Sequence, residues 1–227
     1  MRFISINGTG SDAGKTTIAA FLIKALGVTS ALKITVHHGG FCPKETICDG
    51  CSTAEDVPFK VTTDPALLGE GDKDTARFLK AGASKVVWLQ SYPESLKEGI
   101  DSALSYFEKE AKVVVEGNSF LNVRDADIAI MVVPPGFKGL KPSAKEILSK
   151  IDLFVINKHH GHGEALLEDT RSQLISLRPR VPIVVLDPKN PSASGGLAQE
   201  DLLKRVQEAI GPIQRLITDY KFVICNL

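Results

Sequence analysis

The chain has 227 residues, and its 27 lysines and arginines equal its 27 aspartates and glutamates, so the formal net charge at pH 7 is zero. This balance gives no indication of the basic surface of a typical nucleic-acid-binding protein, and no apolar run approaches the roughly 20 residues that cross a bilayer. The N-terminus enters a strand without a basic-then-apolar leader. We therefore expect one cytoplasmic domain over residues 1–227. In that compartment the four cysteines indicate metal or redox chemistry in preference to structural disulfides.

The first expected element is a strand that leads into a glycine-rich turn and then a helix. The strand is the apolar run Phe3–Ile6. The helix has one apolar face, made of Ile18, Phe21, Leu22 and Ala25. In such a turn, glycines let backbone N–H groups close around phosphate oxygens at the helix N-terminus. The sequence therefore predicts a nucleotide-binding phosphate loop made of Gly8, Thr9, Gly10, Ser11, Asp12, Ala13, Gly14, Lys15, Thr16 and Thr17.

The residue types at the end of this loop predict two roles in nucleotide chemistry. Lys15 would reach the β- and γ-phosphates, and the Thr16 hydroxyl would be a ligand of Mg²⁺. The usual pattern has a glycine five residues before Gly14, but Thr9 holds that position and Gly8 lies one residue earlier. The strand before the loop and the helix after it both fit the motif.

Strand-like apolar runs alternate with helix-like segments from one end of the chain to the other. Amphipathic helices are expected over Leu96–Phe107 and Leu202–Ile210. The alternation predicts a three-layer α/β fold, with helices on both faces of a mainly parallel sheet of about seven strands. The expected strands are Phe3–Ile6, Leu32–Val36, Lys85–Leu89, Val113–Val115, Ile128–Val133, Leu153–Ile156 and Ile183–Leu186.

The segment from His37 to Gly71 interrupts this alternation, since it is rich in Cys, Pro, Gly and Asp and is weakly periodic. Three thiolates with one imidazole suit tetrahedral zinc, and three thiolates also suit an iron–sulfur cluster. Chance clustering of the cysteines is the alternative. The candidate ligands are His37, His38, Cys42, Cys48 and Cys51.

The run Asp72–Arg77 opens a helix that closes at Ala81-Gly82. Acidic residues at a helix start often only complement the helix dipole. In a second interpretation, Asp74 is a ligand of metal or water and Arg77, one turn later, contacts phosphate or substrate. Both interpretations are open on the sequence. Either Asp12 or Asp74 is the candidate for orienting the attacking group.

Two later strands end in polar residues, and ligands of open α/β sheets bind beyond the carboxyl ends of the strands. Lys112–Glu116 ends in a carboxylate that would hold Mg²⁺ directly or through water. At the end of another strand, the Asn157 amide would contact a purine base and the Lys158 stem would pack on its plane. A plain polar exit from a buried strand is the alternative for both. Guanine readers usually have an aspartate two residues after the lysine, and His160 stands there, so the base is left open.

These motifs resemble those of two groups of P-loop proteins. The loop Gly8–Thr16 is similar to the longer phosphate loop of dethiobiotin synthetase and the cobyrinic/cobyric acid synthases, in which an acidic residue occupies the Asp12 position. The wider layout resembles the molybdopterin-guanine dinucleotide biosynthesis protein B family (MobB). The pieces that match MobB, in the order the family has them, are Gly14–Thr17, Lys33–His38, Asp72–Arg77, Ala81–Ala83 and Val115–Gly117.

The resemblance implies a dimeric SIMIBI-class P-loop NTPase linked to molybdenum-cofactor maturation. It implies nucleotide and Mg²⁺ roles for Lys15, Thr16 and Glu116, and it suggests that Asp74 and Arg77 lie near the active site.

The chain also departs from MobB. The segment Cys42–Cys51 is not a standard MobB feature, and the chain continues well past Gly117 to the Asn157-Lys158 strand end. These features are more similar to the longer metallocentre-assembly and cobyric-acid-type relatives. Gly10 stands where the dimer-bridging lysine of the class would be expected.

The sequence as a whole predicts Mg²⁺-dependent hydrolysis of ATP or GTP, coupled to maturation of a molybdopterin-type cofactor or of a metallocentre. Lys15 and the loop amides would neutralise charge that develops on the transferring phosphoryl group. A homodimer and a partner protein from cofactor biosynthesis are expected. One alternative is an ATP-dependent ligase of the dethiobiotin/cobyric acid type that activates a small carboxylate. Another is a metal-binding partner protein that uses nucleotide as a conformational switch.

Overall fold

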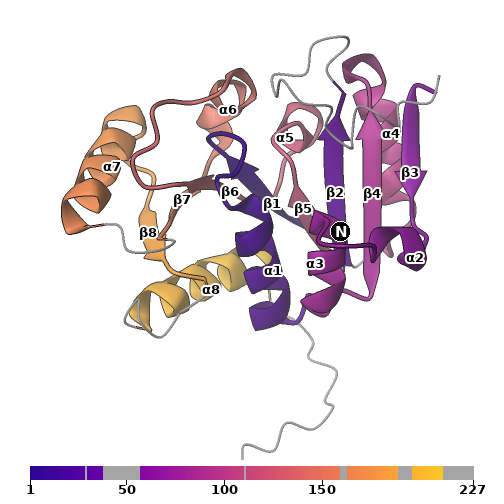
Figure 1. Ribbon diagram of the computed structural model, residues 1–227, viewed down its shortest axis with the longest axis horizontal. Coiled ribbons are helices and arrows are strands. Elements are labelled where there is room, and N and C mark those ends of the chain that lie inside the picture. Colours follow the sequence, from indigo (N-terminus) through magenta and orange to yellow (C-terminus); the bar gives the residue numbers. More distant parts are fainter. Residues whose placement is uncertain (29, 38–56, 110, 159–162, 189–195, 212–227) are drawn as a thin grey trace, which may run out of the picture.

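A computed structural model of the chain describes residues 1–28, 30–37, 57–109, 111–158, 163–188 and 196–211 (Figure 1). These residues form one twisted sheet whose strands are β1 (Arg2–Gly8), β2 (Ser30–Val36), β3 (Phe59–Thr62), β4 (Lys85–Ser91), β5 (Lys112–Glu116), β6 (Ile128–Val133), β7 (Leu153–Asn157) and β8 (Ile183–Leu186). The strand order is β3-β4-β2-β5-β1-β6-β7-β8. Neighbouring strands are parallel, except that β3 runs antiparallel to β4. The mainly parallel α/β sheet predicted from the sequence is therefore confirmed.

The strand that the sequence did not predict is β3, at one edge of the sheet. It lies inside the 37–71 segment, which had been expected to lack regular structure. Four residues are too few for an alternating pattern to stand out, and the strand is formed by its pairing with β4. Part of that segment therefore extends the sheet beyond the expected strands.

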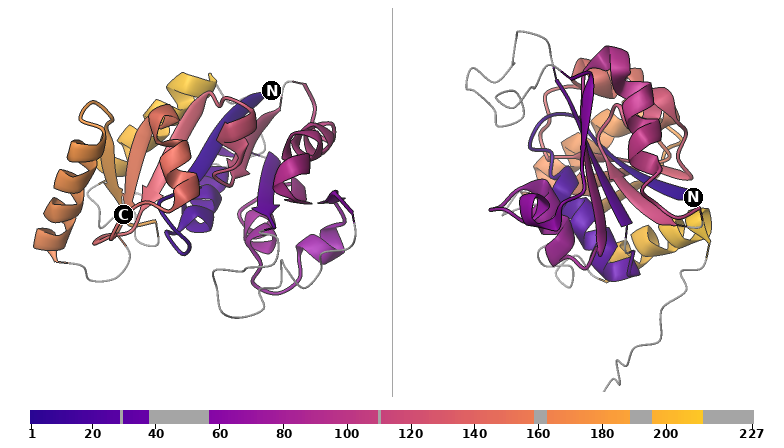
Figure 2. Two further views of the ribbon diagram at one scale, coloured as in Figure 1. Left: turned by 90° about the horizontal axis from the view of Figure 1, so that it is seen from above. Right: turned by 90° about the vertical axis from the view of Figure 1, so that its right-hand side faces the viewer.

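Helices connect the strands and lie on both faces of the sheet (Figures 1 and 2). Short 3₁₀ turns stand at Pro93–Ser95 and Leu148–Lys150. Among the described residues, no helix is both long and apolar enough to cross a membrane. The α-helices are α1 (Lys15–Leu26), α2 (Pro65–Leu68), α3 (Asp74–Lys80), α4 (Leu96–Leu104), α5 (Phe120–Val123), α6 (Pro142–Glu146), α7 (Glu164–Leu177) and α8 (Leu197–Ile210).

The sheet divides the core into two apolar clusters. On one face, residues of α1, α3 and α8 pack against Ile4, Ile6 and other strand residues. On the opposite face, residues of α4, α5, α6 and α7 pack against Val113, Val115 and their neighbours. Both faces of the central strands are buried, and for this reason their sequences are nearly continuous apolar runs. The molecule thus has the predicted three layers.

The buried face of α1 differs in part from the predicted one. Ile18 and Leu22 are fully buried as expected. Phe21 is only partly buried against the cluster, and Ala25 is also half-buried. The other buried apolar residues of α1 are Ala19, Ile23 and Leu26, so the buried face is turned relative to the predicted one.

The parallel register brings several strand ends to one edge of the sheet. β5 pairs with β1 on one side and with β2 on the other, so Glu116 lies opposite both Ile6 and Lys33. The phosphate loop leaves β1 at this same edge, and β7 ends there at Asn157. Polar residues far apart in the sequence are thereby gathered where open α/β sheets bind their ligands.

Candidate functional site

The phosphate loop joins β1 to α1, and Gly14 caps the first turn of the helix. Gly14 has φ +91°, and a Cβ there would lie 1.9 Å from the Asn157 amide nitrogen. A Cβ on Gly8 would lie 2.9 Å from the Lys15 side chain. Close backbone approach therefore requires glycine at both positions.

Thr9, which stands where the usual pattern has a glycine, is anchored through its backbone. Its side chain is buried, its N–H donates to the Val132 carbonyl at 3.2 Å, and its carbonyl accepts from the Lys141 N–H at 2.9 Å. Thr9 thus ties the loop to β6 and to the segment before α6. The Lys15 side chain packs over Gly8, which lies six residues before Gly14 instead of the usual five. Gly8 therefore takes the place of the usual glycine in this longer loop.

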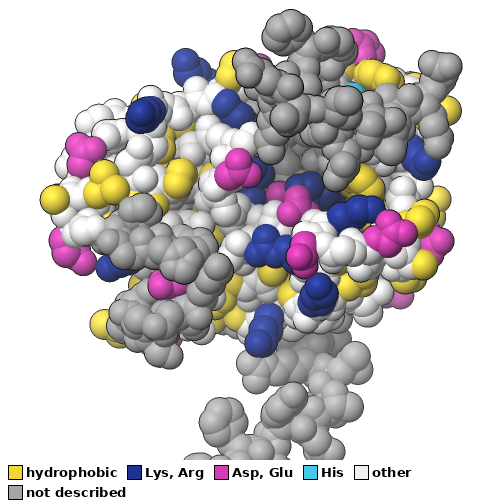
Figure 3. All heavy atoms as spheres, in the orientation of Figure 1, with side chains coloured by type: hydrophobic (Ala, Val, Ile, Leu, Met, Phe, Trp, Pro, Cys, Tyr) yellow, Lys and Arg dark blue, Asp and Glu magenta, His cyan; other side chains and the backbone are white. Residues whose placement is uncertain are grey.

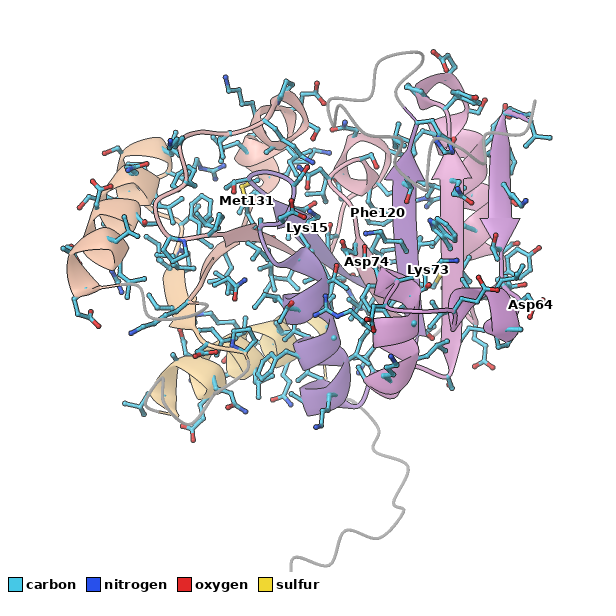
Figure 4. The ribbon with its side chains drawn as sticks, viewed as in Figure 1. Lys15, Asp64, Lys73, Asp74, Phe120 and Met131 are labelled. Atoms are coloured by element: carbon cyan, nitrogen blue, oxygen red, sulfur yellow. The ribbon has the colours of Figure 1, made fainter. Side chains whose placement is uncertain are left out.

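Lys15 folds back over the loop at the N-terminal end of α1 (Figure 4). Its ammonium group donates to the Gly10 carbonyl at 3.3 Å. Burial lowers the pKa of Lys15 below the ordinary lysine value, and the attraction of Glu116 offsets this only in part. A phosphate anion placed in the loop would supply the negative charge that this ammonium lacks.

Beside Lys15, one hydroxyl and two carboxylates form a compact cluster. The Thr16 hydroxyl lies 2.7 Å from Asp74 Oδ1 and 3.0 Å from Glu116 Oε2. The Lys33 ammonium donates to Asp74 Oδ2 at 2.5 Å and to Glu116 Oε1 at 2.7 Å. The Glu116 side chain is 1% exposed. A nearly fully buried carboxylate is thus held by a hydroxyl and a shared lysine.

The charges in this cluster stabilise one another. Burial acts to lower the pKa of Lys33, but Glu116 and Asp74 outweigh it and hold that pKa above 10.5. Burial acts to raise the pKa of Asp74, but Lys33 and hydrogen bonds from Lys33 and Thr16 hold it below 3.8. Both groups are therefore charged at neutral pH.

This donor set fits Mg²⁺. The cation prefers hard oxygen ligands and is usually bound through one or two carboxylates together with substrate phosphates. Thr16, Asp74 and Glu116 supply one hydroxyl and two carboxylates from three elements, directly beside the phosphate loop. The sequence assigned Thr16 and Glu116 to Mg²⁺ and left Asp74 open as a ligand of metal or water, and the structure brings all three side chains together.

The side-chain contacts of Asp74 lie outside its own helix. Asp74 is in the first turn of α3, but its side chain points to α1 and β2 (Figure 4). On the same helix, the Arg77 guanidinium donates to the Thr17 hydroxyl at 2.7 Å. The contacts of Asp74 and Arg77 fix α3 against the start of α1, and both residues line the cleft.

The cleft at this edge of the sheet has a volume of about 1450 Å³. It is lined on one side by Asp12, Lys15 and Thr16, and on the other by residues of α4, α5 and α6. In Figure 3, lysine and arginine side chains alternate with acidic ones in the hollow over α1 and α3. Asp12 is exposed at the rim with φ +56°.

Asn157 lies at the loop, whereas Lys158 does not line the cleft. The Asn157 amide nitrogen donates to the Ala13 carbonyl at 3.2 Å. The Lys158 ammonium lies 3.4 Å from Glu164 Oε1, at the start of α7. The expected packing of the Lys158 stem on a base therefore has no support from the described contacts, while Asn157 is positioned against the phosphate loop.

Three residues whose roles the sequence did not predict complete the site. Lys33 lies in the MobB-like segment Lys33–His38, and no role was predicted for it. A charged residue inside the apolar run of β2 is the sequence signal that could have indicated a charged partner. Asn118 exchanges two hydrogen bonds with Gly8, at 2.9 and 3.0 Å, and no sequence signal marked it. Burial first, and then the charges of Lys15 and Lys33, lower the pKa of Lys141, which lines the cleft.

The predicted zinc or iron–sulfur site lies almost entirely outside the described residues, since Cys42, Cys48, Cys51 and His38 fall in 38–56. His37 is described. It is buried, its N–H donates to the Ser91 carbonyl at 2.9 Å, and its ring lies 5.5 Å from the Tyr92 ring. Within the described part of the chain, no group of three or more His, Cys, Asp and Glu residues is arranged to hold a metal ion.

Comparison with known proteins identifies relatives by structure only. No protein-family model matches the chain, and no curated protein matches its sequence. HypB from Helicobacter pylori in complex with nickel matches 92% of the chain and 89% of its own, with TM-score 0.50 and 14% identity. The hydrogenase maturation factor HypB from Archaeoglobus fulgidus matches 91% of the chain and 90% of its own, with TM-score 0.53 and 15% identity. The chain therefore shares the overall α/β fold of these two proteins, and the closer resemblance to MobB is not shown.

Proposed function

We propose that this protein is a Mg²⁺-dependent nucleoside triphosphate hydrolase. The observation that carries the proposal is the Thr16 hydroxyl, which touches both Asp74 and Glu116 directly beside Lys15 and the phosphate loop. A hydroxyl and two carboxylates at the start of α1 supply a cation site at the place where the loop would hold the β- and γ-phosphates.

Charge neutralisation is the main work of the residues in this site. Lys15 and the loop N–H groups would balance the charge that spreads over the transferring phosphoryl group. Lys141 lines the same cleft and adds a second ammonium group. Thr16, Asp74 and Glu116 would hold Mg²⁺, which would supply further neutralisation of the phosphate charge. Asp12, at the rim, is the candidate for orienting the attacking water, because Asp74 is already engaged by Thr16 and Lys33.

We assign the hydrolysis to maturation of a metallocentre or of a molybdopterin-type cofactor. One structural relative is described as a hydrogenase maturation factor and another as a nickel complex, and the MobB-like segments support the molybdopterin alternative. In this proposal the Cys42–Cys51 segment binds zinc or an iron–sulfur cluster. The protein would act in the cytoplasm as a homodimer, with a partner protein that receives the metal or cofactor.

A ligase that phosphorylates a small carboxylate is a second candidate, and the size of the cleft favours it. Pockets for one small molecule usually measure roughly 300–1,000 Å³, whereas this cleft measures about 1450 Å³. A second substrate would therefore have room beside the nucleotide. The ligase predicts that turnover is negligible until a small carboxylic acid is added.

The first test is the Lys15→Ala variant, with release of phosphate from ATP and from GTP measured in the presence of Mg²⁺. Removal of one group that neutralises transition-state charge typically costs about 10²–10³-fold in rate, so we expect turnover to fall at least that far. Circular dichroism should show an unchanged fold. Lys24→Ala, an exposed lysine in the last turn of the same helix, is the matched control and should keep full turnover. Unchanged turnover in Lys15→Ala would rule out the proposed function.

A further inference from the structure

We infer that Lys141 contacts the γ-phosphoryl group of the bound nucleotide, so that the cleft distinguishes a triphosphate from a diphosphate. This inference rests on the proposed function, because it assigns a further catalytic residue to the same site. Lys141 lines the cleft immediately before α6. It belongs to the segment that follows β6, whereas Lys15 belongs to the first turn of α1.

The backbone of Lys141 is anchored to the phosphate loop. Its N–H donates to the Thr9 carbonyl at 2.9 Å, and its own carbonyl accepts from the N–H groups of Ala144 at 2.9 Å and Lys145 at 3.1 Å. Pro142 follows directly and stands at the start of α6. A residue before proline is restricted to extended backbone, and Lys141 has ψ 158°. The base of the side chain is therefore held in a fixed position beside the loop.

The ammonium group of Lys141 forms neither a hydrogen bond nor an ion pair within the part of the chain that the structure describes. The other two lysines of the site are engaged, Lys15 by the Gly10 carbonyl and Lys33 by two carboxylates. The Lys141 side chain is nevertheless half-buried. Removing a cation from water without a compensating charge is unfavourable. An anion bound in the cleft would compensate this charge.

The charges that act on Lys141 show which part of the cleft its ammonium group occupies. Burial lowers the pKa of Lys141 most, and the positive charges of Lys15 and Lys33 lower it further. Because the interaction of two charges weakens with distance, the ammonium group lies near both of these lysines. Three ammonium groups therefore converge on one part of the cleft, and the described residues give Lys141 no counter-charge.

This part of the cleft is where the γ-phosphate of a bound nucleotide would lie. The lysine of a phosphate loop reaches the β- and γ-phosphates, and the hydroxyl that follows it faces the cation. Lys15 marks the first of these positions, and the cluster of Thr16, Asp74 and Glu116 marks the second. Lys33 lies on that cluster, so an ammonium group near both lysines is near the terminal phosphate. A diphosphate lacks the group that would be contacted.

The proposed contact stabilises charge during hydrolysis. The oxygen of water forms a bond to the γ-phosphorus while the bond from that phosphorus to the β,γ-bridging oxygen breaks. The products are the nucleoside diphosphate and inorganic phosphate, and one proton of the water is released to solvent. Charge is spread over the γ-phosphoryl oxygens in the transition state, and a preorganised cation stabilises it. Lys141 would supply this cation without gaining or losing a proton.

Calorimetry with Mg²⁺ tests the contact with two ligands, a non-hydrolysable triphosphate and the matching diphosphate, in adenine and in guanine form. Lys141→Met removes the charge and keeps a long side chain. Lys145→Met is the matched control, because Lys145 is exposed one turn later in α6. We expect Lys141→Met to weaken triphosphate binding by about 10- to 100-fold, the range of a hydrogen bond to a charged group, and to leave diphosphate binding unchanged. Lys145→Met should change neither.

Phosphate release at saturating nucleotide is the second measurement. We expect Lys141→Met to lower it by about 10²–10³-fold, with an unchanged circular dichroism spectrum. Lys141→Arg keeps the positive charge and should retain more turnover than Lys141→Met. If Lys141 acted only through its backbone contacts with the loop, both variants would keep the turnover and the triphosphate preference of the unaltered protein, and the inference would be overturned.

The inference and the proposed function fail in different ways. Equal weakening of triphosphate and diphosphate binding in Lys141→Met would overturn the γ-phosphate contact, and so would no weakening of either. Nucleotide hydrolysis would still stand if the unaltered protein released phosphate and Lys15→Ala did not. If the unaltered protein bound neither ligand, the hydrolase itself would be ruled out, and the role of Lys141 with it.

Discussion

Lys33 holds together the two carboxylates of the site. Its ammonium group contacts Asp74 and Glu116 at once, and its side chain is 16% exposed. Removing one partner of a buried ion pair leaves an uncompensated charge, whereas the intact pair adds little net stability. The position of Lys33 between two carboxylates therefore matters most when no other cation balances them.

We expect Lys33→Met to destabilise the protein by about 3 kcal/mol in the absence of Mg²⁺, because Glu116 and Asp74 would then face each other without a cation. The free energy of unfolding would be measured by urea titration with and without Mg²⁺. Added Mg²⁺ should recover part of the loss. Lys73→Met, which breaks an exposed pair with Glu70, should cost less than about 1 kcal/mol. Equal losses in the two variants would contradict the role of Lys33.

Lys141 gives the site a dependence on pH. Burial, followed by the charges of Lys15 and Lys33, lowers its pKa below 10.5, so the ammonium is lost earlier than in an ordinary lysine as pH rises. Bound triphosphate favours the charged form. Affinity for the nucleotide should therefore fall as pH rises through the lowered pKa. The free energy of unfolding of the ligand-free protein changes in the opposite direction. The lysine keeps its proton to a higher pH in the unfolded chain than in the folded protein, so the stability rises with pH between the two pKa values.

The measurement is the nucleotide dissociation constant between pH 7 and pH 10 for the unaltered protein and for Lys141→Met. The variant should bind more weakly at pH 7 and should show a flatter pH dependence. An unchanged pH profile in the variant would show that Lys141 does not contact the bound phosphates.

At the scale of elements, the site depends on how β1 and β5 are joined at their carboxyl ends. Asn118 follows β5, and its amide both accepts from the Gly8 N–H and donates to the Gly8 carbonyl. It also lies 3.3 Å from the Ser143 hydroxyl, just after α6 begins. One buried side chain thus connects the start of the phosphate loop, the end of β5 and α6.

We expect Asn118→Ala to cost about 1–3 kcal/mol, since it leaves buried backbone groups of Gly8 without partners. The variant should also weaken nucleotide binding by loosening the loop. Thermal unfolding with and without nucleotide measures both effects. The control is Asn122→Ala, which removes an exposed hydrogen bond to Glu146 and should leave stability nearly unchanged. A loss no larger than that of the control would show that water replaces the Asn118 contacts.

On the scale of the whole molecule, one sheet joins both core clusters. Helices α1, α3 and α8 cover one face and α4 to α7 cover the other, so each central strand contributes to both clusters. Such an arrangement predicts that the described residues unfold as one cooperative unit. The expectation of a single domain over residues 1–227 can be tested in this way.

Leu202→Ala provides that test, because Leu202 is fully buried in α8 and Trp88, the only tryptophan, lies in β4. The truncation should cost about 2–5 kcal/mol. Trp88 fluorescence and circular dichroism should report the same lowered urea midpoint. Leu197→Ala, whose side chain is 77% exposed, should stay within about 0.5 kcal/mol. A Trp88 transition that does not move in Leu202→Ala would indicate two independent units.

The sequence alone determined the layers and the phosphate loop, because these depend on neighbouring residues. Apolar runs predicted the seven long or strongly apolar strands, and the order of strand, glycine-rich turn and helix predicted the loop around Lys15. Glu116 and Asn157 were candidates in the sequence because each is a polar residue at the end of an apolar strand. The apolar pattern did not predict β3, because β3 has only four residues and depends on pairing with β4, which begins far along the chain.

Only the tertiary structure decided which side chains meet. Lys33 and Asp74 are 41 residues apart, and Lys33 and Glu116 are 83 apart. Their contact follows from β2 pairing with β5, and strand order depends on the burial of both sheet faces, which no local pattern contains. The same holds for Asn157, 144 residues from Ala13, whose free amide oxygen appears only when β7 is placed beside the loop.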